Sequence, residues 1–186
     1  MRKQLVIDAR PLNHGHAGIT RLLSDYLEHS SDDVQIYLLF QKVMVENIKI
    51  DLSRFHIISE RNAMFKFLPS SIWFAFFAFR LIPKSADWFW ATNTLVPFFR
   101  NKKLKLLCTL HDFVHIDAPN TMTFVNLMFF RFFFKKSLFL ADEIQTTTEL
   151  AVQRINQISP ALCEKCTVNQ PGVSKEFADP HYVRET

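Results

Sequence analysis

Short apolar runs, each ended by polar or turn-forming residues, constrain the fold of this chain more than any other feature. The clearest are residues 4–7, 34–40 and 104–110. These runs are continuous rather than alternating and rich in Val, Ile and Leu, as in strands that are covered on both faces. We predict the remaining strands at 55–59, 87–91, 143–147 and 166–169.

Helical segments alternate with these strands. In residues 19–29 the apolar positions recur at i, i+3, i+4, i+7 and i+8, which predicts an amphipathic helix. Further helices are predicted at 72–82, 121–140 and 148–157. We expect Ser70 or Ser71 to cap the first of these and Pro83 to stop it. The alternation predicts an α/β domain with a mainly parallel, doubly wound sheet and helices on both faces.

Composition limits the partners that such a domain would have. The chain of 186 residues is 48% hydrophobic and carries a net charge of +4, with a pI of about 9.0. This charge fits an acidic ligand or an anionic membrane surface. The Lys and Arg residues form no dense stripe, so no nucleic acid is expected as a partner. The first apolar run ends at Asp8, far short of a signal peptide, and three cysteines suit a reducing compartment, so we expect a cytoplasmic protein.

Two aromatic segments stand out among the 20 phenylalanines, at residues 64–82 and 121–140. Neither provides about 20 apolar residues without a charge, so neither is expected to span a membrane. The segments could be core helices, or they could form an apolar interface with a partner domain. They could also rest on a membrane. In that third interpretation five basic residues would contact lipid phosphates: Lys66, Arg80, Arg131, Lys135 and Lys136.

Chemically distinctive residues follow two of the predicted strands. In parallel sheets ligands bind just beyond the carboxyl ends of the strands. Gly15 and Gly18 lie in the loop after the first strand, where they indicate either an ordinary turn or an anion site at a helix N-terminus. Arg21 lies in the first turn of that helix, where it either contacts an anion or is simply solvated.

His111 and Asp112 follow the strand at 104–110. A histidine at a strand end can donate to a substrate hydroxyl or accept its proton, and it can equally be a packing residue of a loop. Cys163 and Cys166 form a CxxC pair without two further ligands at matching spacing, so no metal site is expected. The G-x-S-x-G and Walker A motifs are absent from the sequence.

Five segments in order resemble one known family. They are "IDARPL" with "AGITR", "DWFWATNTLVPFF", "LLCTLHDFVHIDAP", "ADEIQTTTELAVQRI" and "CTVNQPGVSKEF". Together they resemble the N-terminal half of GT-B glycosyltransferases of the family 4 type. These are retaining, nucleotide-sugar-dependent enzymes, many of them hexosyltransferases of bacterial polysaccharide and lipopolysaccharide synthesis. The resemblance implies a Rossmann-like domain that forms one half of a GT-B fold.

The resemblance also implies roles for individual residues. The loop with Gly15 and Gly18 would lie near the acceptor and the donor diphosphate, and Arg21 would orient that loop or contact phosphate. His111 and Asp112 would be the catalytic residues. His111 would hydrogen-bond a hydroxyl of the transferred sugar, and Asp112 would shape the loop or the acceptor site. The further substrate-binding candidates are Asn93, Thr148 and Glu149, of which the last two belong to a segment that is more structural in the family.

The expected domain plan follows from the same resemblance. Residues 1–174 would form the N-terminal domain, and residues 175–186 would begin a linker toward a donor-binding domain. That domain, or a separate subunit, would be a partner, together with a sugar or lipid-linked acceptor and an anionic membrane surface. No cofactor and no metal are expected, since the nucleotide sugar is a substrate. The alternative is a non-catalytic Rossmann-like module that docks a partner through its aromatic surface.

Overall fold

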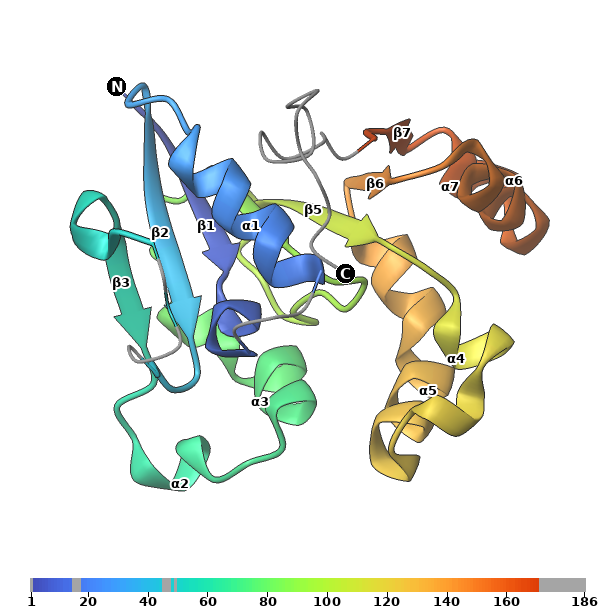
Figure 1. The fold of residues 1–186 in the computed structure, drawn as a ribbon, viewed down its shortest axis with the longest axis horizontal. Coiled ribbons are helices and arrows are strands. Elements are labelled where there is room, and N and C mark those ends of the chain that lie inside the picture. The colour runs from blue at the N-terminus through green and yellow to red at the C-terminus, as the bar shows by residue number, and fades with distance from the viewer. Residues whose placement is uncertain (1, 15–17, 45–47, 49, 171–186) are drawn as a thin grey trace, which may run out of the picture.

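The computed structural model describes residues 2–14, 18–44, 48 and 50–170. Within these residues seven strands form one parallel sheet in the order β3-β2-β1-β4-β5-β6-β7 (Figure 1). The strands are β1 (Lys3–Asp8), β2 (Val34–Phe40), β3 (His56–Ser59), β4 (Trp88–Ala91), β5 (Lys105–Leu110), β6 (Glu143–Thr146) and β7 (Cys166–Val168). The predicted α/β class with a Rossmann-like, doubly wound parallel sheet is confirmed.

The helices and 3-10 helices connect these strands. The helices are α1 (Gly18–Glu28), α2 (Ala63–Lys66), α3 (Ser70–Phe76), α4 (Val114–Asp117), α5 (Phe124–Leu140), α6 (Glu149–Ile158) and α7 (Pro160–Cys163). The 3-10 helices are η1 (Arg10–His14), η3 (Leu52–Arg54), η4 (Ala78–Leu81) and η5 (Pro119–Thr121). In Figure 1, α1 lies over β1, and α6 and α7 lie at the end of the sheet beside β6 and β7.

Side chains alternate along each strand between two cores. In β1, Val6 faces one core and Ile7 the other, and both are fully buried. On the face of the sheet that carries Ile7, the strand packs against Leu23 and Leu27 of α1. Because both faces of β1 are covered, the strand is apolar at successive positions rather than at alternate ones.

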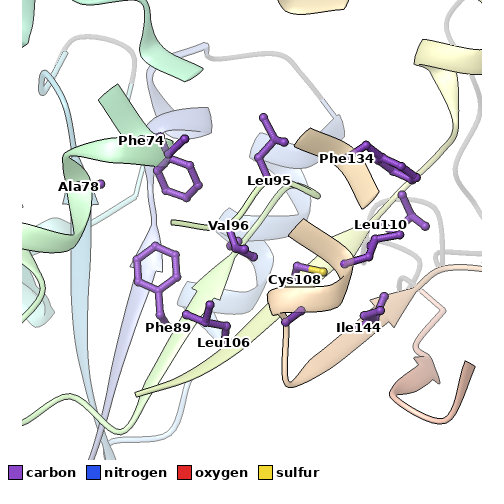
Figure 2. Close-up of a cluster of buried hydrophobic side chains, with 14 of the residues drawn as sticks. Phe74, Ala78, Phe89, Leu95, Val96, Leu106, Cys108, Leu110, Phe134 and Ile144 are labelled. Carbon is purple, nitrogen blue, oxygen red and sulfur yellow. The ribbon is translucent and has the colours of Figure 1, made fainter. Parts of the chain in front are cut away.

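The larger core lies on the other face of the sheet, between its central strands and the aromatic segments. Figure 2 shows Phe74 of α3, Phe89 of β4, Cys108 of β5 and Phe134 of α5 gathered in this core. Both aromatic segments therefore contribute to the core. Within the described residues, no helix is long and apolar enough to cross a membrane.

The first aromatic segment is not the single helix that was predicted over 72–82. Helix α3 begins at Ser70, and neither Ser70 nor Ser71 caps it, because the N-cap position is Pro69. The helix ends at Phe76, since Phe77 leaves the helical conformation with φ −124° and ψ −25°, and the chain continues as the 3-10 helix η4 before Pro83. The Ser70 hydroxyl instead accepts a hydrogen bond from Arg10, which is a tertiary contact that the local pattern does not contain.

Candidate functional site

The strand order reverses at β1, which has β2 on one side and β4 on the other. Ligands of open parallel sheets bind outside the carboxyl ends of the strands at such a reversal. Three polar segments lie at this edge: residues 8–10 at the end of β1, 92–94 after β4, and 111–112 after β5. The sequence pattern predicted the first and third of these segments as neighbours of a ligand, and the family resemblance added Asn93 in the second. The parallel sheet brings all three to one edge.

His111 is fixed to the end of the neighbouring strand. Its Nε2 lies 2.9 Å from the backbone oxygen of Thr92. Because a carbonyl oxygen only accepts, Nε2 carries the hydrogen, and in the neutral ring Nδ1 then bears a lone pair. Nδ1 makes no hydrogen bond to any other described residue. The half-buried ring can therefore accept one hydrogen bond from a hydroxyl at this edge.

Thr92 links His111 to the end of β1. The Thr92 hydroxyl donates to the backbone oxygen of Asp8 at 2.9 Å, and this contact is buried. Two successive hydrogen bonds therefore join the ends of β1, β4 and β5, through Asp8, Thr92 and His111. This chain of contacts fixes the position of the imidazole relative to the strand reversal.

Asp8 and Arg10 form an ion pair that the sequence analysis did not predict. Asp8 is 1% exposed, and its two carboxylate oxygens accept from Arg10 Nε at 2.7 Å and Nη2 at 2.8 Å. Arg10 Nη1 donates to both oxygens of Ser70, and the guanidinium lies 3.8 Å from the ring centroid of Phe74. A bidentate pair of this kind is strong and directional. It anchors α3 to the end of β1, so Arg10 has a supporting role.

The glycine loop is only partly described. Gly15 lies outside the described residues. Gly18 is the first residue of α1, and a Cβ placed there would meet no atom within 4 Å. Packing within the described residues therefore gives no reason for a glycine at this position. Arg21 is exposed on the same helix and makes no ion pair with any other described residue.

Three other candidates have local partners. Asn93 is half-buried, and its Oδ1 accepts from the backbone N–H of Thr94 at 2.7 Å, which leaves its amide hydrogens as donors. Thr148 is the N-cap of α6 and accepts from the Ala151 N–H at 3.2 Å. Glu149 is exposed in the first turn of α6, where a carboxylate favours the helix dipole. The contacts of Thr148 and Glu149 are those expected at a helix N-terminus.

Asp112 shapes the turn that follows His111. Its Oδ1 accepts from the Val114 N–H at 2.9 Å, at the start of α4. His115, one turn later, is only 6% exposed and packs against Phe134 of α5 with ring centroids 4.2 Å apart. Burial lowers the pKa of His115, against the opposing effect of Asp112 and Asp117. His115 is therefore held as a neutral ring between α4 and α5.

A second ion pair fixes the far side of α4. Asp117 accepts from Arg154 of α6 at 2.6 and 2.7 Å, and these hydrogen bonds lower the pKa of the Asp117 carboxyl. The Arg154 guanidinium also lies 4.1 Å from the ring centroid of Phe113. The segment after His111 is thus attached to both α5 and α6. Sequence reasoning missed this pair because the two residues are far apart along the chain.

The cysteines and the acidic residues form no metal centre in the described part of the chain. No group of three or more His, Cys, Asp or Glu side chains there could hold a metal ion. Burial raises the pKa of the Cys108 thiol to about 12 and that of Cys166 to about 11, so both are held as thiols. The Cys166 Sγ contacts the backbone oxygen of Leu162 at 3.2 Å.

No known protein-family model matches this chain, and no curated protein matches its sequence. The glycosyltransferase resemblance therefore rests on the sequence motifs alone.

Proposed function

We propose that this chain is the acceptor-binding half of a retaining, nucleotide-sugar-dependent glycosyltransferase of bacterial cell-surface polysaccharide or lipopolysaccharide synthesis. One observation carries the proposal beyond the motifs. His111 is fixed by Nε2 to the end of β4, next to the strand reversal, and its Nδ1 is unoccupied by described residues. A sugar hydroxyl is a ligand that such a nitrogen can accept from.

Sugar recognition needs both acceptors and donors at close range. His111 supplies an acceptor, and the Asn93 amide supplies donors one residue from the carbonyl that holds His111. In this proposal the two side chains bind hydroxyls of the transferred sugar and of the acceptor. Asp112 supports the site by holding the turn into α4 rather than by relaying a proton from His111.

The donor diphosphate is proposed to lie near the N-terminus of α1. That helix has 11 residues, and its first N–H groups together with Arg21 provide positive charge. The nucleotide part of the donor would be bound by a second domain or a separate subunit. In this proposal residues 1–186 bind an acceptor without transferring sugar, and no metal or cofactor is required.

A non-catalytic docking module is the second candidate. It is favoured by the large exposed aromatic side chains of α5, including Phe124 at 76% and Phe132 at 69% exposure. The two candidates differ in whether sugars bind beside His111, at the carboxyl ends of β1, β4 and β5. We call this place the His111 edge. In either case we propose that the protein acts on the inner side of the cytoplasmic membrane, as a peripheral protein.

Saturation-transfer NMR with a panel of hexoses and hexosyl phosphates tests sugar binding. We expect saturation transfer with the wild-type chain and at least a tenfold weaker signal with His111→Ala. His29→Ala is a matched control, because the His29 ring contacts a backbone oxygen, that of Asp25, at 2.8 Å after the end of α1. Equal signals from wild type and His111→Ala would contradict the assignment. Absence of binding by all three proteins would favour the docking module.

A transfer assay tests the proposed division of labour. The purified 186-residue chain is incubated with nucleotide sugars and a lipid-linked acceptor, and we expect no glycosylated product. Sugar transfer by this chain alone would contradict the assignment of the donor site to a second domain.

A further inference from the structure

Helix α5 exposes one apolar face. Phe124, Val125, Phe132 and Phe139 are 76%, 56%, 69% and 53% exposed. Val125, Phe132 and Phe139 are each seven residues apart, so they form a line along the helix. We call the surface made by these four residues with Arg131, Lys135 and Lys136 the outer face of α5. Its apolar side chains extend along the helix, and it lies away from the core.

The opposite face of α5 is already in the core. Phe129, Phe134 and Leu138 are between 0% and 7% exposed and pack with the central strands. A helix that is apolar all round is normally buried on every side. In the part of the chain that the structure describes, only one side of α5 is covered. The outer face is therefore expected to contact something beyond these residues.

The charges on the outer face are all of one sign. Arg131, Lys135 and Lys136 are exposed, and α5 contains no acidic residue. None of the three makes an ion pair with a described residue, and Lys136 Nζ lies 4.5 Å from the ring centroid of Phe98. Phenylalanines interleaved with uncompensated cations are typical of helices that lie in an anionic membrane interface.

The first aromatic segment combines these properties to a smaller extent. It exposes Phe67 at 83% and Met64 at 66%, and its Lys66 makes no ion pair with a described residue. Trp73 and Phe74 are fully buried, and Arg80 is paired with the buried Glu60 at 3.1 Å and stacked on Phe65. Arg80, which the sequence analysis included among the lipid-contacting cations, is therefore already compensated. Of the two segments, the second presents three cations without an ion pair to a described residue and three exposed phenylalanines on one continuous helix, Phe124, Phe132 and Phe139.

We propose that the outer face of α5 is a binding surface for an anionic lipid bilayer. The 17-residue helix lies parallel to the membrane, with its phenylalanines among the acyl chains and its cations at the lipid phosphates. This proposal does not depend on sugar transfer. It does have a consequence for the site: α5 packs on α4 through His115 and Phe134, and α4 follows His111 by three residues (Figure 1). Lipid binding would thus hold the His111 edge close to the membrane surface.

Flotation with vesicles tests this proposal. The vesicles contain phosphatidylcholine alone or phosphatidylcholine mixed with phosphatidylglycerol, at low and at high salt. We expect wild-type protein to float with the anionic vesicles, to bind less as salt rises, and to bind neutral vesicles weakly. No flotation with anionic vesicles at low salt would overturn the proposal.

Two triple variants separate the outer face from net charge. The test variant carries Arg131→Gln, Lys135→Gln and Lys136→Gln, and the control carries Lys84→Gln, Lys102→Gln and Lys103→Gln at exposed positions elsewhere. Both lose the same charge. At about fivefold per cation, the test variant should bind on the order of 100-fold more weakly, and the control within about twofold of wild type. Equal losses in the two variants would overturn the proposal.

A third variant tests the aromatic part and the competing occupant. Phe132→Ser with Phe139→Ser should reduce vesicle binding at least tenfold at low salt. We expect both this variant and wild type to be monomeric in dilute solution. If wild type self-associates instead, and this variant abolishes that association without affecting flotation, the outer face is a protein interface and the proposal fails. Hexose binding by each variant, measured without lipid, should equal that of wild type, so failure here is distinct from failure of the sugar site.

Discussion

The two aromatic segments, residues 64–82 and 121–140, have similar compositions and different positions in the fold. The first is broken into α2, α3 and η4, and its largest side chain, Trp73, is fully buried with its Nε1 donating to Glu60 at 3.0 Å. The second ends in the continuous helix α5, which has one face in the core and one exposed. The comparison teaches that aromatic content alone does not distinguish a core helix from a surface helix.

The charges explain part of this difference. Arg80 of the first segment has a buried carboxylate partner in Glu60, whereas Arg131, Lys135 and Lys136 of the second have none among the described residues. Burial alone would raise the pKa of Glu60, but hydrogen bonds from Trp73 and Asn62 and the charge of Arg80 hold it below its ordinary value. The charge of Arg80 is thus paired inside the fold, whereas Lys66 of the same segment makes no ion pair with a described residue.

Truncation of the buried tryptophan should have the largest effect. Trp73→Ala removes a fully buried side chain and leaves Glu60 without one of its donors, and we expect it to lower the free energy of unfolding by about 3–5 kcal/mol. The matched change in the second segment, Phe132→Ala, should stay within about 0.5 kcal/mol because that side chain is exposed. Urea unfolding followed by circular dichroism measures both. Similar losses in the two variants would mean that both segments are core.

Removal of the Arg80 charge should have an intermediate effect. Arg80→Gln leaves the buried Glu60 carboxylate with fewer donors, at a cost of about 1 kcal/mol, since the guanidinium side chain is 38% exposed and water screens the pair. Lys135→Gln on the outer face of α5 should leave stability unchanged within about 0.5 kcal/mol. Chemical denaturation of both variants provides the comparison. A larger loss for Lys135→Gln would show that its charge is compensated in the folded protein.

The pH dependence contributed by His115 should be the smallest of these effects. Burial lowers the pKa of His115 below 6.5, so the unfolded chain binds a proton more readily than the folded protein. The stabilisation that comes from the neutral His115 ring is therefore fully present above pH 6.5. It declines as the pH falls toward the lower pKa that His115 has in the folded protein. Stability of wild type relative to His115→Phe should decrease over this range. His29→Phe, at an exposed position, is the control and should track wild type.

Much of the fold could be predicted because the strands carry their own signal. The predicted strand at 34–40 coincides with β2, and the other predicted strands differ from the observed ones by one residue at one or both ends. The predicted helix at 19–29 is α1 shifted by one residue. These elements are specified by apolar periodicity, which is local. The helix predicted at 72–82 was wrong in its extent, because Phe77 leaves the helical conformation and the chain continues as the 3-10 helix η4.

The candidate site was only partly predictable. The sequence placed His111 and Asp112 after an apolar strand, and β5 ends immediately before them. It did not indicate that the His111 ring would donate to the Thr92 carbonyl. Nor did it indicate that Arg10 would form an ion pair with Asp8 while donating to Ser70. These contacts join residues from different strands and helices. They depend on the spatial order of the strands, in which β4 lies between β1 and β5.

By itself the sequence determined the class of fold, the places where strands and helices form, and the polar residues that end the strands. It could do so because burial on two faces imposes a continuous apolar pattern on each strand. The tertiary structure decided which polar residues meet at one edge, which cations are compensated, and which face of α5 is exposed. Those outcomes depend on packing between segments that are distant in sequence, and no local pattern records them.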